Sequence, residues 1–84
     1  MSDRIREILR AHGQLPVDVA TLGAGTDLYT AGLKSFAVVQ VMLALEAAYD
    51  VEFPERMLSR RTFFSIAAIE AALGELVAET AAAK

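Results

Sequence analysis

The 84-residue sequence contains no cysteine and a single histidine, His12. Without cysteine there is no disulfide framework, no thiolate metal ligand and no protein thiol that could carry an acyl group. One histidine cannot build a multi-histidine metal site by itself, so we expect no bound metal. If this protein handles thioesters, the sulfur atom must come from outside the chain.

Positive charge and long apolar runs are also scarce. The formal net charge is −3 and the pI is near 5.0, whereas a nucleic-acid surface needs clustered lysine and arginine; Arg56, Arg60 and Arg61 form a small local basic group. The apolar run FAVVQVMLAL is interrupted by Gln40 and is too short to cross a bilayer. The opening residues MSDRIREILR are charged where a signal peptide would be apolar. We therefore expect a cytoplasmic protein that binds neither nucleic acid nor a membrane.

Hydrophobic residues make up 55% of the chain and charged residues 23%, a balance typical of a folded domain and not of a disordered segment. We expect a single domain over residues 1–84, in which residues 78–84 fray because the apolar pattern ends there. Apolar residues recur at helical spacings, and no strand pattern of similar strength accompanies them. The sequence therefore predicts an all-α fold, a small four-helix bundle of three main helices and one short helix.

The first predicted helix is capped by Ser2 or Asp3 and ends near Gly13. A long loop then covers residues 13–34 and contains four of the five glycines. A loop of this length inside a compact domain is usually functional. The apolar residues that support the first helix are Ile5, Ile8 and Leu9, and those expected to pin the loop to the core are Leu15, Val17, Val19, Leu22 and Leu28.

The last third of the chain predicts a short helical piece and a final helix. Pro54 suits the first turn of the short piece, PERMLSR. Thr62 is the expected cap of the final helix. The apolar residues that recur at three- and four-residue spacings in the final helix are Ile66, Ile69, Leu73, Leu76 and Val77.

Between these segments, a strongly apolar helix is predicted from Ser35 or Phe36 to Tyr49. Sorted at 100° per residue, its apolar residues occupy two faces. In so small a domain one face is core and the other is exposed as a partner-binding surface or packed under the long loop. The first face contains Val38, Val41, Met42, Leu45 and Tyr49, and the second contains Phe36, Val39 and Leu43, with Gln40 and Ala47 beside them.

Ser35 stands where the long loop meets this helix, and its residue type allows three interpretations. It can cap the helix, or it can carry a phosphate, which the free N–H groups and dipole of a helix N-terminus favour. A hydrolase site would combine Ser35 with His12 and Asp27, but no G-x-S-x-G elbow surrounds the serine. A cap and a point of attachment are compatible, so both interpretations stay open.

The stretch DLYTAGLKSFAVVQVMLALEAAYDVEFP resembles the phosphopantetheine-binding carrier proteins, small helical bundles related to acyl carrier protein. It matches their Asp-Leu, Gly-Leu-Asp-Ser-Leu, apolar helix ending in Leu-Glu and closing aliphatic-Pro pair, and the likeness covers most of the chain. The resemblance implies that a phosphopantetheinyl transferase attaches 4′-phosphopantetheine from coenzyme A to Ser35. The thiol of this arm would then carry an acyl or aminoacyl group as a thioester. The arm would thus supply the thiol that the cysteine-free chain lacks.

The sequence departs from the family pattern in two places. Lys34 stands where the family usually has aspartate. Ala37, Gln40 and Ala47 stand where fatty-acid carriers often have acidic residues. With these departures, the GLKSF loop and the arginine-rich PERMLSRR segment make the chain look more like the discrete aminoacyl carrier proteins. Those are charged by amino acid ligases that resemble truncated seryl-tRNA synthetases.

The resemblance implies a monomeric carrier that is not itself an enzyme. Its partners would be the transferase, an acyl- or amino-acid-activating ligase and a downstream acceptor enzyme. Two alternatives remain open: an acyl carrier protein of a fatty-acid, polyketide or nonribosomal peptide pathway, and an unmodified helical adaptor with Ser35 as a plain cap. The residues expected to contact partners are Leu33, Lys34, Phe36, Val39, Gln40, Leu43, Arg56 and Arg60.

Overall fold

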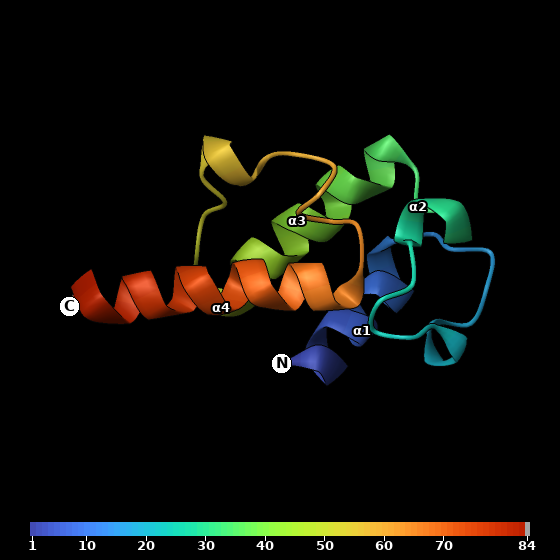
Figure 1. Ribbon diagram of the computed structural model, residues 1–84, viewed down its shortest axis with the longest axis horizontal. Helices are drawn as coiled ribbons and strands as arrows, with labels where there is room; N and C mark the ends of the chain where they lie inside the picture. Colours follow the sequence, from blue (N-terminus) through green and yellow to red (C-terminus); the bar gives the residue numbers. More distant parts are fainter. Residues whose placement is uncertain (84) are drawn as a thin grey trace.

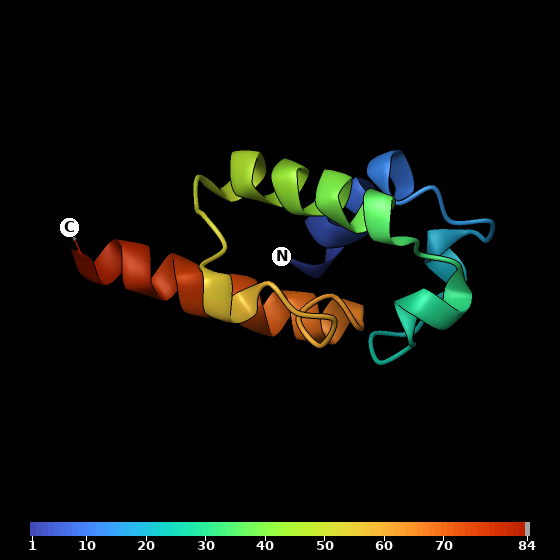
Figure 2. The same cartoon turned by 90° about the horizontal axis from the view of Figure 1, so that it is seen from above.

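The computed structural model describes the backbone of residues 1–83 and the side chains up to Thr80. Figure 1 shows the loop that carries α2 at one end of the molecule, and Figure 2 shows α1 and α3 on one side and α4 on the other. Figure 2 shows α4 extending past the other helices toward the C-terminus, and the molecule measures 40 × 23 × 20 Å. In chain order the elements are α1 (Ser2–His12), the 3₁₀ turn η1 (Val19–Thr21), α2 (Leu28–Ala31), α3 (Ser35–Tyr49), the 3₁₀ turn η2 (Glu55–Met57) and α4 (Ile66–Ala83).

The predicted all-α fold is confirmed, and residues 1–83 contain no strand. The short helix, however, is not where the sequence analysis put it. The segment that begins at Pro54 forms only the turn η2, whereas α2 lies inside the long loop. Residues 78–83 continue α4 and Lys84 lies outside the described residues, so fraying of residues 78–84 stays a prediction.

The predicted helix caps are also corrected. Met1 takes the N-cap position of α1 without a side-chain hydrogen bond, so neither Ser2 nor Asp3 caps this helix, while Gly13 ends it as predicted. The last helix is capped by Ser65, whose Oγ accepts a hydrogen bond from the Ala68 N–H at 3.1 Å. Thr62 lies in the preceding turn instead. A serine directly before the first helical residue reaches the free N–H groups, which Thr62, placed earlier, cannot.

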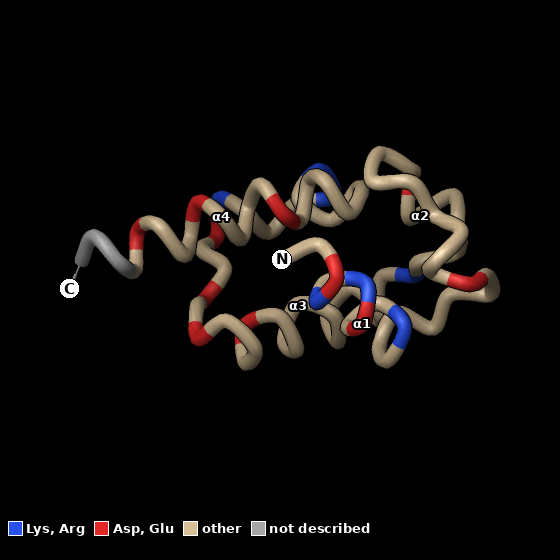
Figure 3. The backbone as a smooth tube through the Cα atoms, turned by 90° about the horizontal axis from the view of Figure 1, so that it is seen from below, with Lys and Arg blue, Asp and Glu red and all other residues tan. Residues whose placement is uncertain are grey.

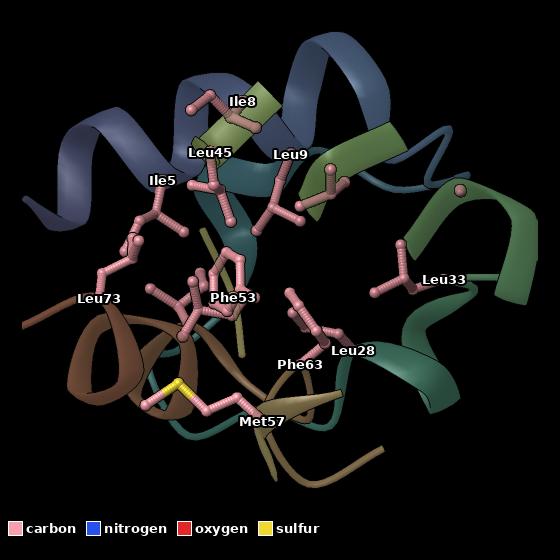
Figure 4. Close-up of a cluster of buried hydrophobic side chains, with 14 of the residues drawn as sticks. Ile5, Ile8, Leu9, Leu28, Leu33, Leu45, Phe53, Met57, Phe63 and Leu73 are labelled. Carbon is pink, nitrogen blue, oxygen red and sulfur yellow. The ribbon is translucent and has the colours of Figure 1, made fainter. Parts of the chain in front are cut away.

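One hydrophobic cluster fills the space between the helices, as Figure 4 shows. The rings of Phe53 and Phe63 lie at its centre, with centroids 5.4 Å apart and planes inclined by 51°, a favourable tilted arrangement for two aromatic rings. Two of the expected loop anchors, Val19 and Leu28, are fully in this core, and Leu15 and Leu22 pack against it. Val17 is exposed, so its prediction as an anchor is wrong.

The long loop is ordered by hydrogen bonds to both neighbouring helices. The Arg6 guanidinium of α1 donates from Nη1 to the carbonyl oxygens of Val19, at 3.0 Å, and Leu22, at 2.8 Å. Farther along, the carbonyl oxygen of Ala24 accepts from the Ala67 N–H of α4 at 2.9 Å. These contacts fix the loop at both sides, and the loop in turn delivers α2 and the start of α3.

Candidate functional site

Ser35 is the first residue of α3, and its side chain is exposed. The N-cap position belongs to Lys34, so the interpretation of Ser35 as the cap is wrong. The first hydrogen bond of the helix joins the Val38 N–H to the Lys34 carbonyl oxygen at 3.0 Å, so the N–H groups ahead of Val38 are the unpaired donors of the helix start. Among the described residues, no hydrogen bond involves the Ser35 hydroxyl, so it is available for reaction.

The short helix α2 determines where Ser35 lies. The Asp27 carboxylate caps α2 by accepting from the N–H groups of Tyr29, at 2.9 Å, and Thr30, at 3.3 Å. The Thr30 hydroxyl also donates to this carboxylate, and it is the largest cause that holds the pKa of Asp27 below its usual value. The chain then turns at Gly32, with φ of 120°, and enters α3.

Gly32 is required at this turn for two reasons. A φ of 120° is a conformation that residues with a Cβ rarely adopt. In addition, a Cβ at this position would lie 2.5 Å from Cδ of Pro16, well inside van der Waals contact. The glycine of the GLKSF segment is therefore explained by its backbone conformation and by its close packing against Pro16 of the loop.

An open groove of about 400 Å³ begins at Ser35. One wall is the side of α3 that carries Val38, Val39 and Met42, and the other is the turn after η2 with Leu58 and Arg60. The lining is mainly apolar, and the groove is open to solvent. It therefore offers a surface along which a flexible group attached to Ser35 can lie.

Tyr29 of α2 and Arg60, which both line this groove, contact each other. The Tyr29 hydroxyl donates to the carbonyl oxygen of Arg60 at 3.0 Å, and the Arg60 guanidinium carbon lies 4.0 Å from the centre of the Tyr29 ring. Partial burial raises the pKa of Tyr29, and the nearby Arg60 charge opposes this shift. The contact joins residues 31 positions apart, so the sequence alone gave no signal of it.

The second apolar face of α3 is exposed to solvent. The sequence analysis allowed two outcomes for this face, exposure or packing under the long loop, and the first is observed. Phe36, Val39 and Leu43 are 56%, 48% and 52% exposed, and Gln40 is exposed beside them. Three large apolar side chains in a row on one helix form a surface suited to a partner. Leu58, which is also exposed on the opposite wall of the groove, extends this surface and was not among the predicted contacts.

Two residues near Ser35 are buried, contrary to the sequence interpretation. Leu33 is 3% exposed and belongs to the core, and Figure 4 shows it on the inner side of the loop. It is therefore corrected from a partner contact to a core residue that anchors the start of α3. Ala37 is fully buried, so it does not mark a surface position from which an acidic residue is missing.

The predicted basic group does not act as one patch. The Arg56 guanidinium pairs with Glu79 at 2.9 Å and Glu75 at 3.3 Å, both on α4. Arg60 lies over Tyr29 instead. Figure 3 shows the basic positions divided mainly between α1 and the segment before α4, with acidic positions along α4 and after α3.

Glu46, the one acidic residue of α3, has a structural role. Its Oε2 accepts from the Phe53 N–H at 2.8 Å and thereby holds the segment that follows the helix. The carboxylate is half-buried. Its removal would therefore disturb the chain around Phe53, and it is not a clean probe of electrostatic attraction by a partner.

The residues of the hydrolase alternative serve other structural purposes. The Asp27 carboxylate is occupied at the start of α2, and His12 lines a different, shallow depression between α1 and α3. No hydrogen bond joins Ser35, His12 and Asp27 in the described structure.

No group of three or more His, Asp or Glu side chains within the described residues is placed to hold a metal ion. None of the described helices combines the length and the hydropathy that a membrane crossing needs.

Comparison with known proteins identifies the family. The family model described as the phosphopantetheine attachment site matches residues 3–73. The chain belongs to the phosphopantetheine-binding carrier proteins. The predicted resemblance is thereby confirmed. The prosthetic group of this family is 4′-phosphopantetheine, and the groove at Ser35 can be compared with what this group needs.

A curated relative of this carrier protein is an aminoacyl carrier, which agrees with the subclass that the sequence predicted. The curated aminoacyl carrier protein of Agrobacterium fabrum is 56% identical over 70 residues, which cover 83% of this chain and 84% of that protein. A carrier protein from Agrobacterium tumefaciens was crystallised with AMP and an engineered glycine:[carrier protein] ligase from Bradyrhizobium japonicum. The match to that structure has 53% identity and a TM-score of 0.86, and it covers 88% of this chain and 99% of the matched one. A solution structure from Agrobacterium tumefaciens matches with 49% identity and a TM-score of 0.78, covering 98% and 99% of the two chains.

The residues around Ser35 fit the prosthetic group of this carrier family. An exposed serine hydroxyl without a hydrogen-bond partner among the described residues can accept a phosphopantetheinyl group, and the helix start behind it favours the phosphodiester. Lys34 adds a positive charge next to it. The apolar groove gives the uncharged remainder of the arm a surface to contact.

Proposed function

We propose that this protein carries an aminoacyl group as a thioester on a 4′-phosphopantetheine arm attached to Ser35. The observation that carries the proposal is the position of Ser35. Its exposed hydroxyl stands at the N-terminus of α3 and at the end of an apolar groove, in a chain that belongs to the carrier family. When bound, the arm supplies the thiol that the cysteine-free chain lacks.

The chain itself supplies position and charge, and we propose no catalytic role for it. The unpaired N–H groups at the start of α3 are the donors next to a phosphodiester on Ser35, and Lys34, the preceding residue, adds a positive charge to the same segment. Asp27, the nearest acid in sequence, uses its carboxylate oxygens at α2 and so competes little for these donors. The protein therefore holds the arm, and partner enzymes perform the chemistry.

Three kinds of partner follow from this function. A phosphopantetheinyl transferase modifies Ser35, an amino acid ligase loads the thiol, and an acceptor enzyme takes the aminoacyl group. Support for the ligase comes from the similar carrier protein that was crystallised with a glycine:[carrier protein] ligase. We propose that the carrier works as a monomer in the cytoplasm, where coenzyme A and ATP are available to these enzymes.

The proposed docking surface is the exposed row on α3 together with the groove wall opposite it. Phe36, Val39 and Leu43 provide apolar area, Gln40 lies beside them, and Leu58 adds the opposite wall. With Glu46 engaged by the backbone, α3 presents no free carboxylate to a basic enzyme. The interface therefore relies mainly on apolar contact, and salt should slow loading only modestly, since charges at the rim act on the encounter rate.

The attachment is tested by incubation with coenzyme A and a phosphopantetheinyl transferase, followed by intact-mass measurement. We expect one phosphopantetheinyl group on the wild-type protein and none on Ser35→Ala. Ser59→Ala is the matched control, because Ser59 lines the same groove and is also exposed, and it should be modified normally. Modification of Ser35→Ala would overturn the assignment, and an unmodified wild-type protein would favour the adaptor alternative.

The cargo is tested on the modified protein with ATP, an amino acid and an amino acid:[carrier protein] ligase. The expected product has the added mass of one aminoacyl group, and hydroxylamine should release it because the linkage is a thioester. The unmodified protein is the control and should not be loaded. Loading by an acyl ligase in place of an amino acid ligase would move the protein to the acyl carriers.

A further inference from the structure

A single tyrosine holds both the backbone and the side chain of Arg60. The Tyr29 hydroxyl donates to the Arg60 carbonyl oxygen at 3.0 Å, while the guanidinium carbon lies 4.0 Å above the centre of the same ring. Stacking on an aromatic face fixes the plane of a guanidinium and is itself favourable. Arg60 is thus an exposed arginine whose side chain has a defined position beside the groove.

Arg60 forms no ion pair among the described side chains, although its charge is a minor contribution to the lowered pKa of Asp27. The contact with Tyr29 places the guanidinium carbon over the ring, and among the described residues the Arg60 guanidinium donates no hydrogen bond. Its N–H groups lie in the plane of the group, at its edge, and the edge is the part that binds phosphate oxygens in a bidentate manner.

Ser35 and Arg60 line the same groove. The phosphodiester is the one ionised group of a 4′-phosphopantetheine arm, and it is bonded directly to the serine oxygen. A fixed cation beside this groove therefore has one anion in the arm with which to pair. We propose that Arg60 binds the phosphodiester on Ser35 and so fixes the direction in which the arm leaves the protein, an inference that rests on the proposed function.

In this arrangement the phosphodiester lies between two positive groups from different parts of the chain. One is the N-terminus of α3, and the other is the Arg60 guanidinium, which Tyr29 holds. Because the ring already orders the arginine, binding the anion costs little additional side-chain entropy. Arg60 then acts within the carrier on its own arm, which differs from the partner-contact role that its sequence position suggested.

The test compares Arg60→Gln with Arg61→Gln, a neighbouring exposed arginine that does not line the groove. Intact mass first establishes that each variant carries the arm. The ³¹P NMR resonance of each modified protein is then recorded in the native state and in urea, where the arm is free. In wild-type protein and Arg61→Gln we expect the same native ³¹P shift. In Arg60→Gln the resonance should move toward its value in urea. The Arg60 Nε–H resonance should also shift between the unmodified and modified wild-type protein.

Two Tyr29 variants test the stack itself. Tyr29→Phe keeps the ring and loses the hydroxyl, and it should retain the native ³¹P shift, whereas Tyr29→Leu should move it as Arg60→Gln does. A native ³¹P shift in modified Arg60→Gln that equals the wild-type value would overturn the inference and leave the proposed function intact. Failure of the wild-type protein to gain the arm would overturn the proposed function instead.

Discussion

Leu45 and Leu43 lie two positions apart on α3 and differ sharply in environment, since Leu45 is 0% exposed and Leu43 is 52% exposed. Replacing each by alanine makes the same chemical change in the same helix. The difference between their free energies of unfolding therefore isolates burial. The pair tests directly whether one apolar face of α3 is core and the other is a docking surface.

The expected magnitudes follow from these exposures. Leu45→Ala leaves a cavity between the helices and should cost about 2–5 kcal/mol of the free energy of unfolding. Full burial of a leucine side chain contributes about 1.5–3 kcal/mol, so the half-exposed Leu43 should lose no more than about 1 kcal/mol, and the higher helix propensity of alanine offsets a little of that. A domain of this size has roughly 4–12 kcal/mol of total stability, so the Leu45 variant is strongly weakened.

The assay is urea unfolding followed by circular dichroism, with the midpoint and slope analysed by linear extrapolation. In parallel, the modified variants are loaded by an amino acid ligase. We expect Leu43→Ala to keep its stability and to be loaded more slowly. Leu45→Ala should be loaded at a near-normal rate per folded molecule. Equal destabilisation by the two changes would refute the division of α3 into a core face and an exposed face, and normal loading of Leu43→Ala would refute the role of the exposed face in docking.

Three further outcomes are expected. Gly32→Ala should destabilise the protein by about 1–3 kcal/mol through backbone strain, with the clash against Pro16 added; an unchanged urea midpoint would contradict the required positive φ. Glu46→Ala should cost about 1–3 kcal/mol because it leaves a half-buried backbone N–H without its acceptor, and a loss of loading without any loss of stability would instead indicate partner contact. The pKa of Asp27 is lowered, chiefly by the Thr30 hydroxyl, so its contribution to stability is present above its unfolded-state pKa and is lost as the pH falls through the folded value. Asp27→Asn should therefore flatten the acid limb of the stability curve, and an identical acid limb would contradict this.

The local parts of the site could be predicted from the sequence because they depend on neighbours along the chain. The run from Ser35 to Tyr49 contains no proline or glycine, so helix was the expected state, and α3 has those bounds. The pattern also separated Leu45 from Leu43 correctly. It could not assign Ala37, because alanine suits the core and the surface equally well.

The errors concern places where a local signal competed with packing. Ser2 and Thr62 are good capping residues, but the helix boundaries fall elsewhere and Ser65 caps α4. Leu33 looked like part of an exposed motif, yet the turn at Gly32 directs it into the core.

The sequence by itself determined that any thiol must be added, and it placed Ser35 at the start of an apolar helix. Composition and local periodicity are sufficient for both statements. Only the tertiary structure decided that the second face of α3 stays exposed and is not covered by the long loop, because that depends on where the loop packs. It also decided that Arg60 lies on Tyr29, 31 positions away along the chain, and lines the same groove as Ser35. Such a contact exists only after the core has brought α2 and the segment before α4 together, and no periodicity within either segment encodes it.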